Sequence, residues 1–489
     1  MKISKRAINE KFKHSFQKVS EFSGSGLSSI ESQYQRLRDQ RVTLGVTGLS
    51  QSGKSTFITS LINQLSEFDC ASLAGFSPVL SDRLRWVKLH PLDEKDLPEF
   101  PYRHNYQGLA SPNPRWPDST QDVSGCLLEL RLKRVKNKLN PFAIKEFSLF
   151  LEIRDYPGEW LLDLPLRDMT FSRWCAQCNA QYSQDPRAQI MGNLLGELQS
   201  LDPLAPVDKG YLDELNKRYC DFLKACKYSH KSLSLIQPGR FLISGNSDAG
   251  DRSCFVPLLK CGSYTEGQLN GAAEDSYFKV CERRYKSYVK ELVEPFYRDF
   301  FSRIDRQLIL VDVVKALNSG PEYVDDMRQA LANITDSFAY GSRSRLLQLF
   351  RSKIDKVIFA ATKVDQIVSE DHDAAKQLLS VIIKQAYNNA QHEGVTPICE
   401  ATAAVRSSKE IEHQAEKGLS GADSNGEPIG YIHPKIPGRV PSGDQWEPFL
   451  SWEIPQFNPP KGLSFTNSDA IPHIRMDTVI NELIGDKCE

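Results

Sequence analysis

Residues 48–55 read Gly-Leu-Ser-Gln-Ser-Gly-Lys-Ser, a complete match to the phosphate-binding pattern G-x-x-x-x-G-K-[ST]. The apolar run 41–47 before it predicts a buried strand, and residues 56–65 after it carry apolar side chains at helical spacing. In this context backbone N–H groups and the positive end of the helix surround an anion. A plain glycine turn is the alternative, and the complete match with both flanks favours a phosphate loop.

This loop supplies the first predicted ligand contacts. Lys54 is expected to reach the β- and γ-phosphates of a bound nucleotide, and the Ser55 hydroxyl to bind Mg2+. The other loop residues surround the same anion through their backbone N–H groups. We expect nucleotide contacts from Ser50, Gln51, Ser52, Gly53, Lys54, Ser55 and Thr56.

A second motif, Asp-Tyr-Pro-Gly at residues 155–158, follows the apolar run 146–153. An acidic residue there can hold Mg2+ through a water molecule, and a glycine three residues later lets its N–H approach the γ-phosphate. In isolation the tetrapeptide is a common turn. Because it follows a phosphate loop, we interpret Asp155 as a metal-orienting residue and Gly158 as a γ-phosphate sensor.

A third motif, Thr-Lys-Val-Asp at residues 362–365, follows the buried apolar run 356–361. A carboxylate there accepts hydrogen bonds from N1–H and the 2-amino group of guanine, a pair of donors that adenine lacks. We therefore expect Asp365 to select GTP and GDP over ATP, with the Lys363 stem along the base. A solvated charged loop is the alternative, but the order of the three motifs favours a nucleotide site.

Strands and helices alternate around these motifs, which predicts an α/β fold with a doubly wound, mostly parallel sheet. Ligands of such sheets bind at the carboxyl ends of the strands, where all three motifs lie. A hairpin is predicted from 126–132 and 146–153, and a long ordered loop over 66–122. The predicted strands are 41–47, 126–132, 146–153, 307–314, 356–361 and 397–402, and the predicted helices include 161–182, 187–201, 208–228, 275–305, 373–392 and 477–487.

The composition is that of an ordinary globular protein with two or three domains. The chain has 489 residues and a formal net charge of −1, so no global basic field would draw it to nucleic acid. It has no run of about 18 apolar residues that could span a bilayer and no secretory signal. The 11 scattered cysteines indicate a reducing compartment. We expect a cytoplasmic protein.

Two smaller sequence features have alternative interpretations. Cys175 and Cys178, and the looser group of Cys220, Cys226 and His230, are poor evidence for zinc and are expected to be packed thiols. At the N-terminus, an apolar stripe lies among basic residues. It predicts an amphipathic helix that could contact the anionic inner surface of a membrane, or equally pack on its own domain. The stripe consists of Ile8, Phe12, Phe16 and Val19.

The three motifs resemble those of Ras-like GTPases, which implies a P-loop core that uses Mg2+. The gaps between the motifs are wider than a bare core requires, so each gap holds inserted structure. The second insertion begins behind the predicted γ-phosphate sensor, through which nucleotide state could reach a protein partner. We expect N-terminal helices at 1–40, core segments at 41–160 and 307–404, a mainly helical insertion at 161–306, and an irregular β-extension with a C-terminal helix at 405–489.

Five stretches narrow the resemblance: Gly-Leu-Ser-Gln-Ser-Gly-Lys-Ser-Thr (48–56), Asp-Tyr-Pro-Gly-Glu-Trp (155–160), Asp-Arg-Gln-Leu-Ile-Leu-Val-Asp-Val-Val-Lys-Ala-Leu-Asn (305–318), Ala-Thr-Lys-Val-Asp (361–365) and Leu-Ile-Gly-Asp-Lys (483–487). Together they resemble the YcjX-like family of bacterial, stress-associated P-loop GTPases, over nearly the whole chain. The resemblance implies GTP and GDP binding and a role in envelope or phage-shock stress. We predict a Mg2+-dependent GTPase switch; the alternative is a nucleotide-binding scaffold with little hydrolysis.

Two further contacts are expected from loops. A Mg2+-binding threonine of switch I should lie just before the first hairpin strand, where Thr120 is found. Ser119 competes for that role, and a solvated threonine without a ligand is an equal alternative. A backbone N–H after the last strand should reach guanine O6, and Ala403 occupies that place.

The residue expected to orient the attacking water departs from the Ras-like pattern. Glutamine often follows the glycine of the second motif, whereas this chain has Glu159. A carboxylate can orient or deprotonate water, but it repels the γ-phosphate. A structural ion pair is the alternative role. We predict slow turnover, with an internal arginine or a partner protein supplying positive charge; the sequence does not distinguish among Arg85, Arg103 and Arg115.

Overall fold

A computed structural model of the chain describes residues 40–49, 52–92, 97–118, 122–134, 146–229, 231–242, 254–336, 354–392, 394–414 and 416–489. The N-terminal helices expected at 1–40 lie outside these residues, apart from Gln40, which begins the first strand.

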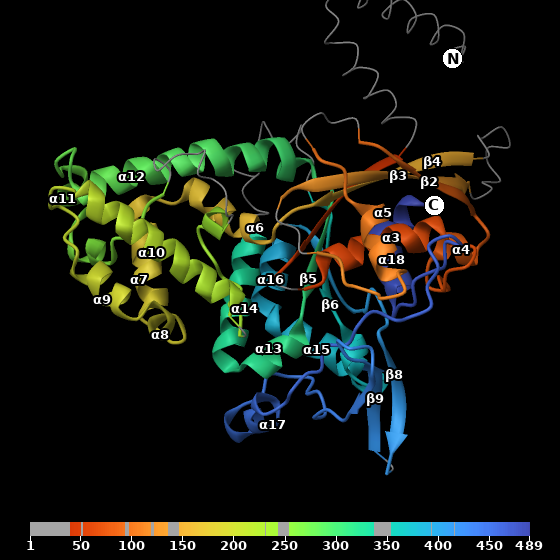
Figure 1. Cartoon of the computed structure of the whole chain (residues 1–489). Helices are drawn as coiled ribbons and strands as arrows, with labels where there is room; N and C mark the ends of the chain where they lie inside the picture. The colour runs from red at the N-terminus through yellow and green to blue at the C-terminus, as the bar shows by residue number, and fades with distance from the viewer. Residues whose placement is uncertain are drawn as a thin grey trace, which may run out of the picture.

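A seven-stranded sheet forms the centre of the molecule (Figure 1). Its order is β2-β3-β4-β1-β5-β6-β7, with the β2–β3 and β3–β4 pairs antiparallel and the remaining neighbours parallel. The predicted α/β class, the mostly parallel sheet and the β3–β4 hairpin are confirmed. The strands are β1 (Gln40–Gly48), β2 (Leu84–His90), β3 (Ser124–Lys133), β4 (Glu146–Asp155), β5 (Arg306–Val311), β6 (Lys356–Ala361) and β7 (Thr396–Ala401).

Helices cover both faces of the sheet and form a lobe beside it (Figure 1). On the sheet lie α3 (Lys54–Ser66), α4 (Ser77–Leu80), α5 (Tyr102–Leu109), α13 (Val313–Ser319), α14 (Pro321–Asp336), α15 (His372–Ile382), α16 (Lys384–His392) and α18 (Met476–Ile484). The short helix α6 (Glu159–Asp163) leads from the sheet into the lobe. The lobe contains α7 (Phe171–Tyr182), α8 (Arg187–Met191), α9 (Asn193–Ser200), α10 (Lys209–Tyr228), α11 (Glu266–Asn270), α12 (Tyr277–Tyr288) and the π-helical turns Val289–Val293 and Phe296–Phe300.

Two apolar clusters hold these layers together. Leu44 of β1 packs with α3 and α18 on one face, and Ile309 of β5 packs with α13 to α16 on the other. Alternate strand residues contribute to opposite clusters, as the period of a strand requires. The second cluster continues into the lobe. Its aromatic centre includes Trp174, whose ring centroid lies 5.2 Å from that of Phe255. The lobe and the sheet therefore share one core.

The long loop predicted for residues 66–122 is wrong. The segment contains α4, α5 and the edge strand β2, which pairs with β3. Only Leu84 of β2 is fully buried, and the pairing register shifts between Leu84 and Trp86. Buried and exposed residues do not alternate along this edge strand, so its sequence lacks the period-2 pattern that predicts a strand. It forms a strand because it pairs with β3.

Several helix boundaries also differ from the predictions. The helix predicted at 161–182 is divided by the 3-10 turn Leu164–Asp168, which contains Pro165, and Gly192, with φ of 55°, separates α8 from α9. The strand predicted to extend to 314 ends at Val311, because Asp312 caps α13 by accepting a hydrogen bond from the Lys315 N–H at 3.0 Å.

Beyond β7, the chain forms a small antiparallel sheet of β8 (Ser408–His413), β9 (Glu416–Ala422) and β10 (Pro428–Tyr431). It projects from the main sheet and packs against the loop that follows β6 (Figure 1). The Tyr431 hydroxyl donates to the Gln366 carbonyl, and the Ser369 N–H donates to Glu410 at 2.5 Å. The short helix α17 (Glu447–Leu450) follows.

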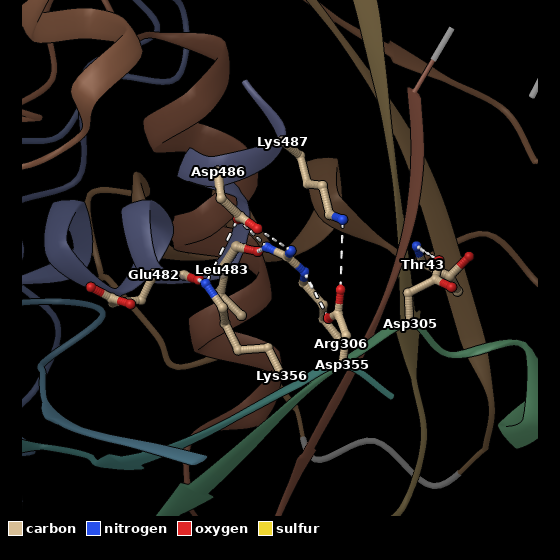
Figure 2. A network of polar contacts seen from close by, with 9 residues as sticks. All are labelled: Thr43, Asp305, Arg306, Asp355, Lys356, Glu482, Leu483, Asp486 and Lys487. Carbon is tan, nitrogen blue, oxygen red and sulfur yellow. Dashed lines mark hydrogen bonds and ion pairs between the residues drawn. The ribbon is translucent and has the colours of Figure 1, made fainter. Parts of the chain in front are cut away.

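A polar network joins the C-terminal residues to the amino ends of β5 and β6, at the edge opposite the three motifs (Figure 2). The buried guanidinium of Arg306 donates to both carboxylate oxygens of Asp486 at 2.5 Å, donates to the Leu483 carbonyl, and lies 3.2 Å from Asp355. We call this set the C-terminal network; its other members are Thr43, Asp305, Lys356, Glu482 and Lys487.

Replacing Arg306 with methionine is expected to lower the free energy of unfolding by about 2–4 kcal/mol. The variant removes the buried guanidinium, but the cost stays below that of a fully buried pair because Asp355 and Asp486 are half exposed and can rehydrate. Urea unfolding measures the change. Arg298→Ala, which removes an exposed ion pair with Asp299, is the matched control and should cost less than about 0.5 kcal/mol. Equal losses in the two variants would contradict the expectation.

The C-terminal network is also expected to weaken in acid. Hydrogen bonds from Arg306 lower the pKa of Asp486 from 3.8 to about 2. A folded-state pKa below the unfolded value contributes stability above about pH 4, which is lost as the pH falls toward about 2. Asp486→Asn should therefore be less stable than the parent chain near neutral pH, and the difference in urea midpoint should shrink as the pH falls from about 4 to about 2. A difference independent of pH would contradict this assignment.

Candidate functional site

The phosphate loop follows β1 and leads directly into α3. Gly53 has φ of 82°, a conformation that favours glycine, and its carbonyl accepts from the Phe57 N–H at 2.9 Å. Gly48 is closely packed as well, since a Cβ there would lie 1.9 Å from the Ser52 hydroxyl and 3.2 Å from the Leu310 Cβ. Ser52 is buried and Thr56 half-buried, whereas the predicted contacts Ser50 and Gln51 lie outside the described residues.

Lys54, the first residue of α3, forms an ion pair with Asp155, the last residue of β4. Asp155 is buried, and the Ser124 hydroxyl donates to its second oxygen at 3.5 Å. Burial lowers the pKa of Lys54, an effect that the ion pair with Asp155 opposes. The structure thus brings the lysine of the first motif to the carboxylate of the second.

The Ser55 hydroxyl donates to the Asp118 carbonyl at 2.9 Å, so the segment that approaches β3 contacts the phosphate loop. The predicted switch residues Ser119 and Thr120 come next and lie outside the described part of the chain. A hydroxyl and a carboxylate are hard oxygen donors of the kind that Mg2+ binds. The Ser55 hydroxyl would therefore suit a bound Mg2+ ion, which the Asp155 carboxylate would hold through a water molecule.

Gly158 lies against the phosphate loop. A Cβ at this position would be 2.3 Å from the Gly48 carbonyl oxygen, so only glycine permits the approach. Gly158 also caps α6, and its carbonyl accepts from the Leu161 N–H at 3.1 Å. The second motif thus contacts the first through its backbone as well as through Asp155.

Glu159 is buried and forms an ion pair with Lys227, whose ammonium lies 2.8 Å from the carboxylate. Lys227 lies in the last turn of α10, within the lobe. Lys227 was not predicted from the sequence. A lysine at the end of an amphipathic helix resembles any solvated charge until the fold places it beside a buried carboxylate.

The third motif lies after β6. Lys363 takes the left-handed conformation with φ of 58°, and its ammonium lies 2.9 Å from the Asp312 carboxylate. Asp365 is buried and accepts from the Ser407 N–H at 3.0 Å and from the Ser407 hydroxyl. Burial raises the pKa of Asp365, against the lowering effect of these hydrogen bonds. Ser407 was not predicted, because no local pattern links it to a carboxylate in an earlier loop.

Ala403 differs from its expected role. Its N–H donates to the Ile474 carbonyl at 3.0 Å, and its carbonyl accepts from the Ile474 N–H at 2.9 Å. This isolated bridge to the C-terminal segment uses the backbone group that was predicted to reach guanine O6. The structure therefore does not offer the Ala403 N–H to a base.

All three motifs lie at one edge of the sheet. Strand pairing aligns Val46 with Asp155 on one side of β1 and Gly48 with Leu310 on the other. Ala361 of β6 pairs with Val311 and Ala401. The carboxyl ends of β1, β4, β6 and β7 thus meet at the edge where ligands of doubly wound sheets bind. The residues predicted to contact the phosphates follow β1 and β4, and those predicted to contact the base follow β6 and β7. Both groups lie at the same edge of the sheet, with β5 between them.

Cys175 and Cys178 are packed thiols, as the sequence predicted. Both lie on the buried side of α7, and all 11 cysteines are free. His230, from the looser group, lies outside the described residues. Across the described ranges, no helix combines the length and apolar character needed to span a bilayer.

Comparison with known proteins gives a consistent result. The profile described as the YcjX-like family, DUF463, matches residues 42–488. A protein of Escherichia coli (strain K12) named Ras-like GTPase YcjX is 35% identical over 455 residues, which are 92% of this chain and 96% of that protein. A protein of the same name from Shewanella oneidensis is 32% identical over 468 residues, 93% of this chain and 96% of the relative. This chain belongs to the YcjX-like family.

Proposed function

We propose that this protein is a Mg2+-dependent switch that binds and hydrolyses GTP. The observation that carries the proposal is the shared edge at which Lys54 and Ser55 of the phosphate loop, Asp155, and the loop of Asp365 all lie. The names of the two relatives, both Ras-like GTPases, support the same activity.

In the proposed reaction, a water oxygen bonds to the γ-phosphorus while the bond to the bridging oxygen breaks, giving GDP and phosphate. One water proton stays on the phosphate and the other passes to solvent. Bound Mg2+ would neutralise phosphate charge at Ser55 and Asp155. Lys54 stabilises charge on the transferring group, and the Gly158 N–H hydrogen-bonds the γ-phosphate. Asp365 and Lys363 recognise guanine.

Hydrolysis is expected to be slow without a partner protein. Glu159 stands where a neutral glutamine would orient water, and a carboxylate in that place repels the oxygens of the γ-phosphate. The same observation favours the second candidate function, in which the protein binds GTP or GDP as a scaffold with little intrinsic hydrolysis.

The remaining expectations concern cellular role and organisation. We propose that the lobe, residues 161–306, relays nucleotide state to a protein partner, since α6 directly follows the γ-phosphate sensor. Residues 41–160 and 307–404 form the GTPase core, and residues 405–489 support its guanine loop. A stress-related role, a cytoplasmic location and peripheral contact with the inner membrane through residues 1–40 belong to the same proposal.

Calorimetric titration with GTP, GDP and ATP, with and without Mg2+, tests nucleotide binding. We expect GTP and GDP to bind at least about 100-fold more tightly than ATP, since adenine leaves Asp365 without its donors. Phosphate release over hours then tests hydrolysis. Preference for ATP would overturn the guanine assignment, and tight GTP binding without phosphate release would leave the scaffold function.

A further inference from the structure

The lobe contacts the segment after Asp155 at three successive points. The buried Tyr156 ring packs edge-on against Phe300, with centroids 5.4 Å apart. Lys227 pairs with Glu159, and the Arg240 guanidinium lies 3.7 Å from the centre of the Trp160 ring. The segment that would sense the γ-phosphate is therefore held by side chains of the lobe.

Residues 159–163 also contact the lobe through backbone groups and hydrogen bonds. A Cβ on Gly239 of the lobe would lie 2.4 Å from the Glu159 carbonyl oxygen. The Gly239 N–H donates to the Asp163 carboxylate at 2.9 Å, and the Gln237 amide donates to the Leu162 carbonyl at 2.5 Å. The backbone of residues 159–163 therefore packs directly against the lobe.

Of the three contacts, the one between Lys227 and Glu159 joins two charged groups that both act on Lys54 of the phosphate loop. The lysine side chain is 18% exposed and the glutamate side chain 10%, so water screens the pair only weakly. Arg240 instead lies over the rings of Trp160 and Phe296, where it fixes the start of α6 by cation–π contact.

The electrostatics of Lys54 place both charges near the phosphate loop. After burial and Asp155, the groups that act on the pKa of Lys54 are Glu159, which raises it, and Lys227, which lowers it. A lysine supplied by the lobe is thus within electrostatic reach of the phosphate-loop lysine, with the Glu159 carboxylate paired to it.

We propose that Lys227 is a positioning residue through which the lobe acts on the γ-phosphate. It orients the Glu159 carboxylate toward the attacking water and neutralises the repulsion between that carboxylate and the triphosphate. This inference rests on the proposed GTPase function and assigns the missing positive charge to the same chain. It also gives the lobe a physical means of controlling turnover, because any movement of α10 moves the ammonium of Lys227.

The test uses the full chain with Mg2+ and compares Lys227→Ala, Lys227→Arg, Glu159→Gln and the double variant Lys227→Ala/Glu159→Gln. Single-turnover phosphate release gives the rate, and calorimetry gives Kd for GDP and for guanosine 5′-(β,γ-imido)triphosphate. Lys224→Ala is the matched control, because Lys224 lies on the same helix but is more exposed, at 38%, and its ammonium lies 4.0 Å from Asp221.

Lys227→Ala should lower the single-turnover rate by about tenfold or more and weaken the imidotriphosphate relative to GDP by about fivefold or more. Affinity for GDP should be unchanged, which also reports a folded site. In the Glu159→Gln background the added loss should be below about twofold, because Lys227 acts through Glu159. Lys227→Arg should recover part of the rate, and Lys224→Ala should match the parent chain.

Two results would overturn the inference: equal losses for Lys227→Ala in both backgrounds, or parallel weakening of GDP and the imidotriphosphate. A parent chain that binds GTP without hydrolysing it would instead contradict the proposed enzymatic function. The inference would then be decided by the affinities of Lys227→Ala for the two nucleotides. Weaker binding of the imidotriphosphate with unchanged binding of GDP supports a role for Lys227 at the γ-phosphate. An unchanged ratio of the two affinities refutes it.

Discussion

Lys54→Ala is expected to lower phosphate release from GTP by about 100-fold or more. The Lys54 ammonium supplies the positive charge of the phosphate loop. Its ion pair with Asp155 places it at the edge of the sheet where the three motifs meet. Affinity for GTP should fall more than affinity for GDP, because Lys54 is expected to contact the γ-phosphate. Steady-state phosphate release and calorimetry measure the two effects.

The effect of Lys54→Ala on stability must be distinguished from its effect on hydrolysis. Without Lys54, the buried Asp155 carboxylate loses its ion pair with that lysine, which destabilises the chain. Lys54→Ala/Asp155→Asn removes that charge and should recover thermal stability but not activity. Lys376→Ala, which breaks the 2.9 Å ion pair with Glu400, is the control for removing a lysine elsewhere. Parent-like hydrolysis by Lys54→Ala would remove the phosphate loop from the mechanism.

Asp365→Asn is expected to weaken GDP binding by about 100-fold. The carboxylate accepts from two guanine donors, and an amide replaces one acceptor oxygen with an N–H2 group that faces another donor. Xanthine carries an oxygen where guanine carries the 2-amino group. Affinity for xanthosine diphosphate should therefore rise while affinity for GDP falls, and competition between the two nucleotides measures the exchange.

An exposed turn provides the matched control for this substitution. Asp423 accepts from the Asn425 and Glu427 N–H groups in the loop between β9 and β10, and Asp423→Asn should leave the preference for guanine unchanged. Because Asp365 also accepts from Ser407, its variant should be checked for a shifted urea midpoint. Reduced affinity for both bases without an exchange of preference would indicate that Asp365 supports the loop but does not read the base.

Features encoded by neighbouring residues were predictable from the sequence. The strand predicted at 356–361 coincides with β6, and the predicted helix after the phosphate loop corresponds to α3. Apolar runs, glycine positions and short motifs act over a few residues, so a single sequence carries enough information for them. The order of the motifs then predicted which edge of the sheet they share.

Features that arise from distant partners were not predictable. Strand β2 owes its identity to pairing with β3, and its own alternation is weak. Lys227 meets Glu159, and Ser407 meets Asp365, only because the folded lobe and the C-terminal extension return to the site. The loop with Thr120 lies outside the described residues, so its role as a metal ligand remains a prediction.

The packing of α18 on α3 has a consequence for synthesis on the ribosome. A nascent chain that has emerged as far as residue 404 already contains all three nucleotide motifs. At that point the residues that pack on the outer side of α3 have not been synthesised. In the folded chain Gln64 donates to the Ile471 carbonyl, and residues 476–488 complete the apolar cluster. Contacts of such long sequence separation form late and slow folding. We expect the unfinished chain to expose this apolar surface to chaperones and to acquire nucleotide only after its C-terminal helix has docked.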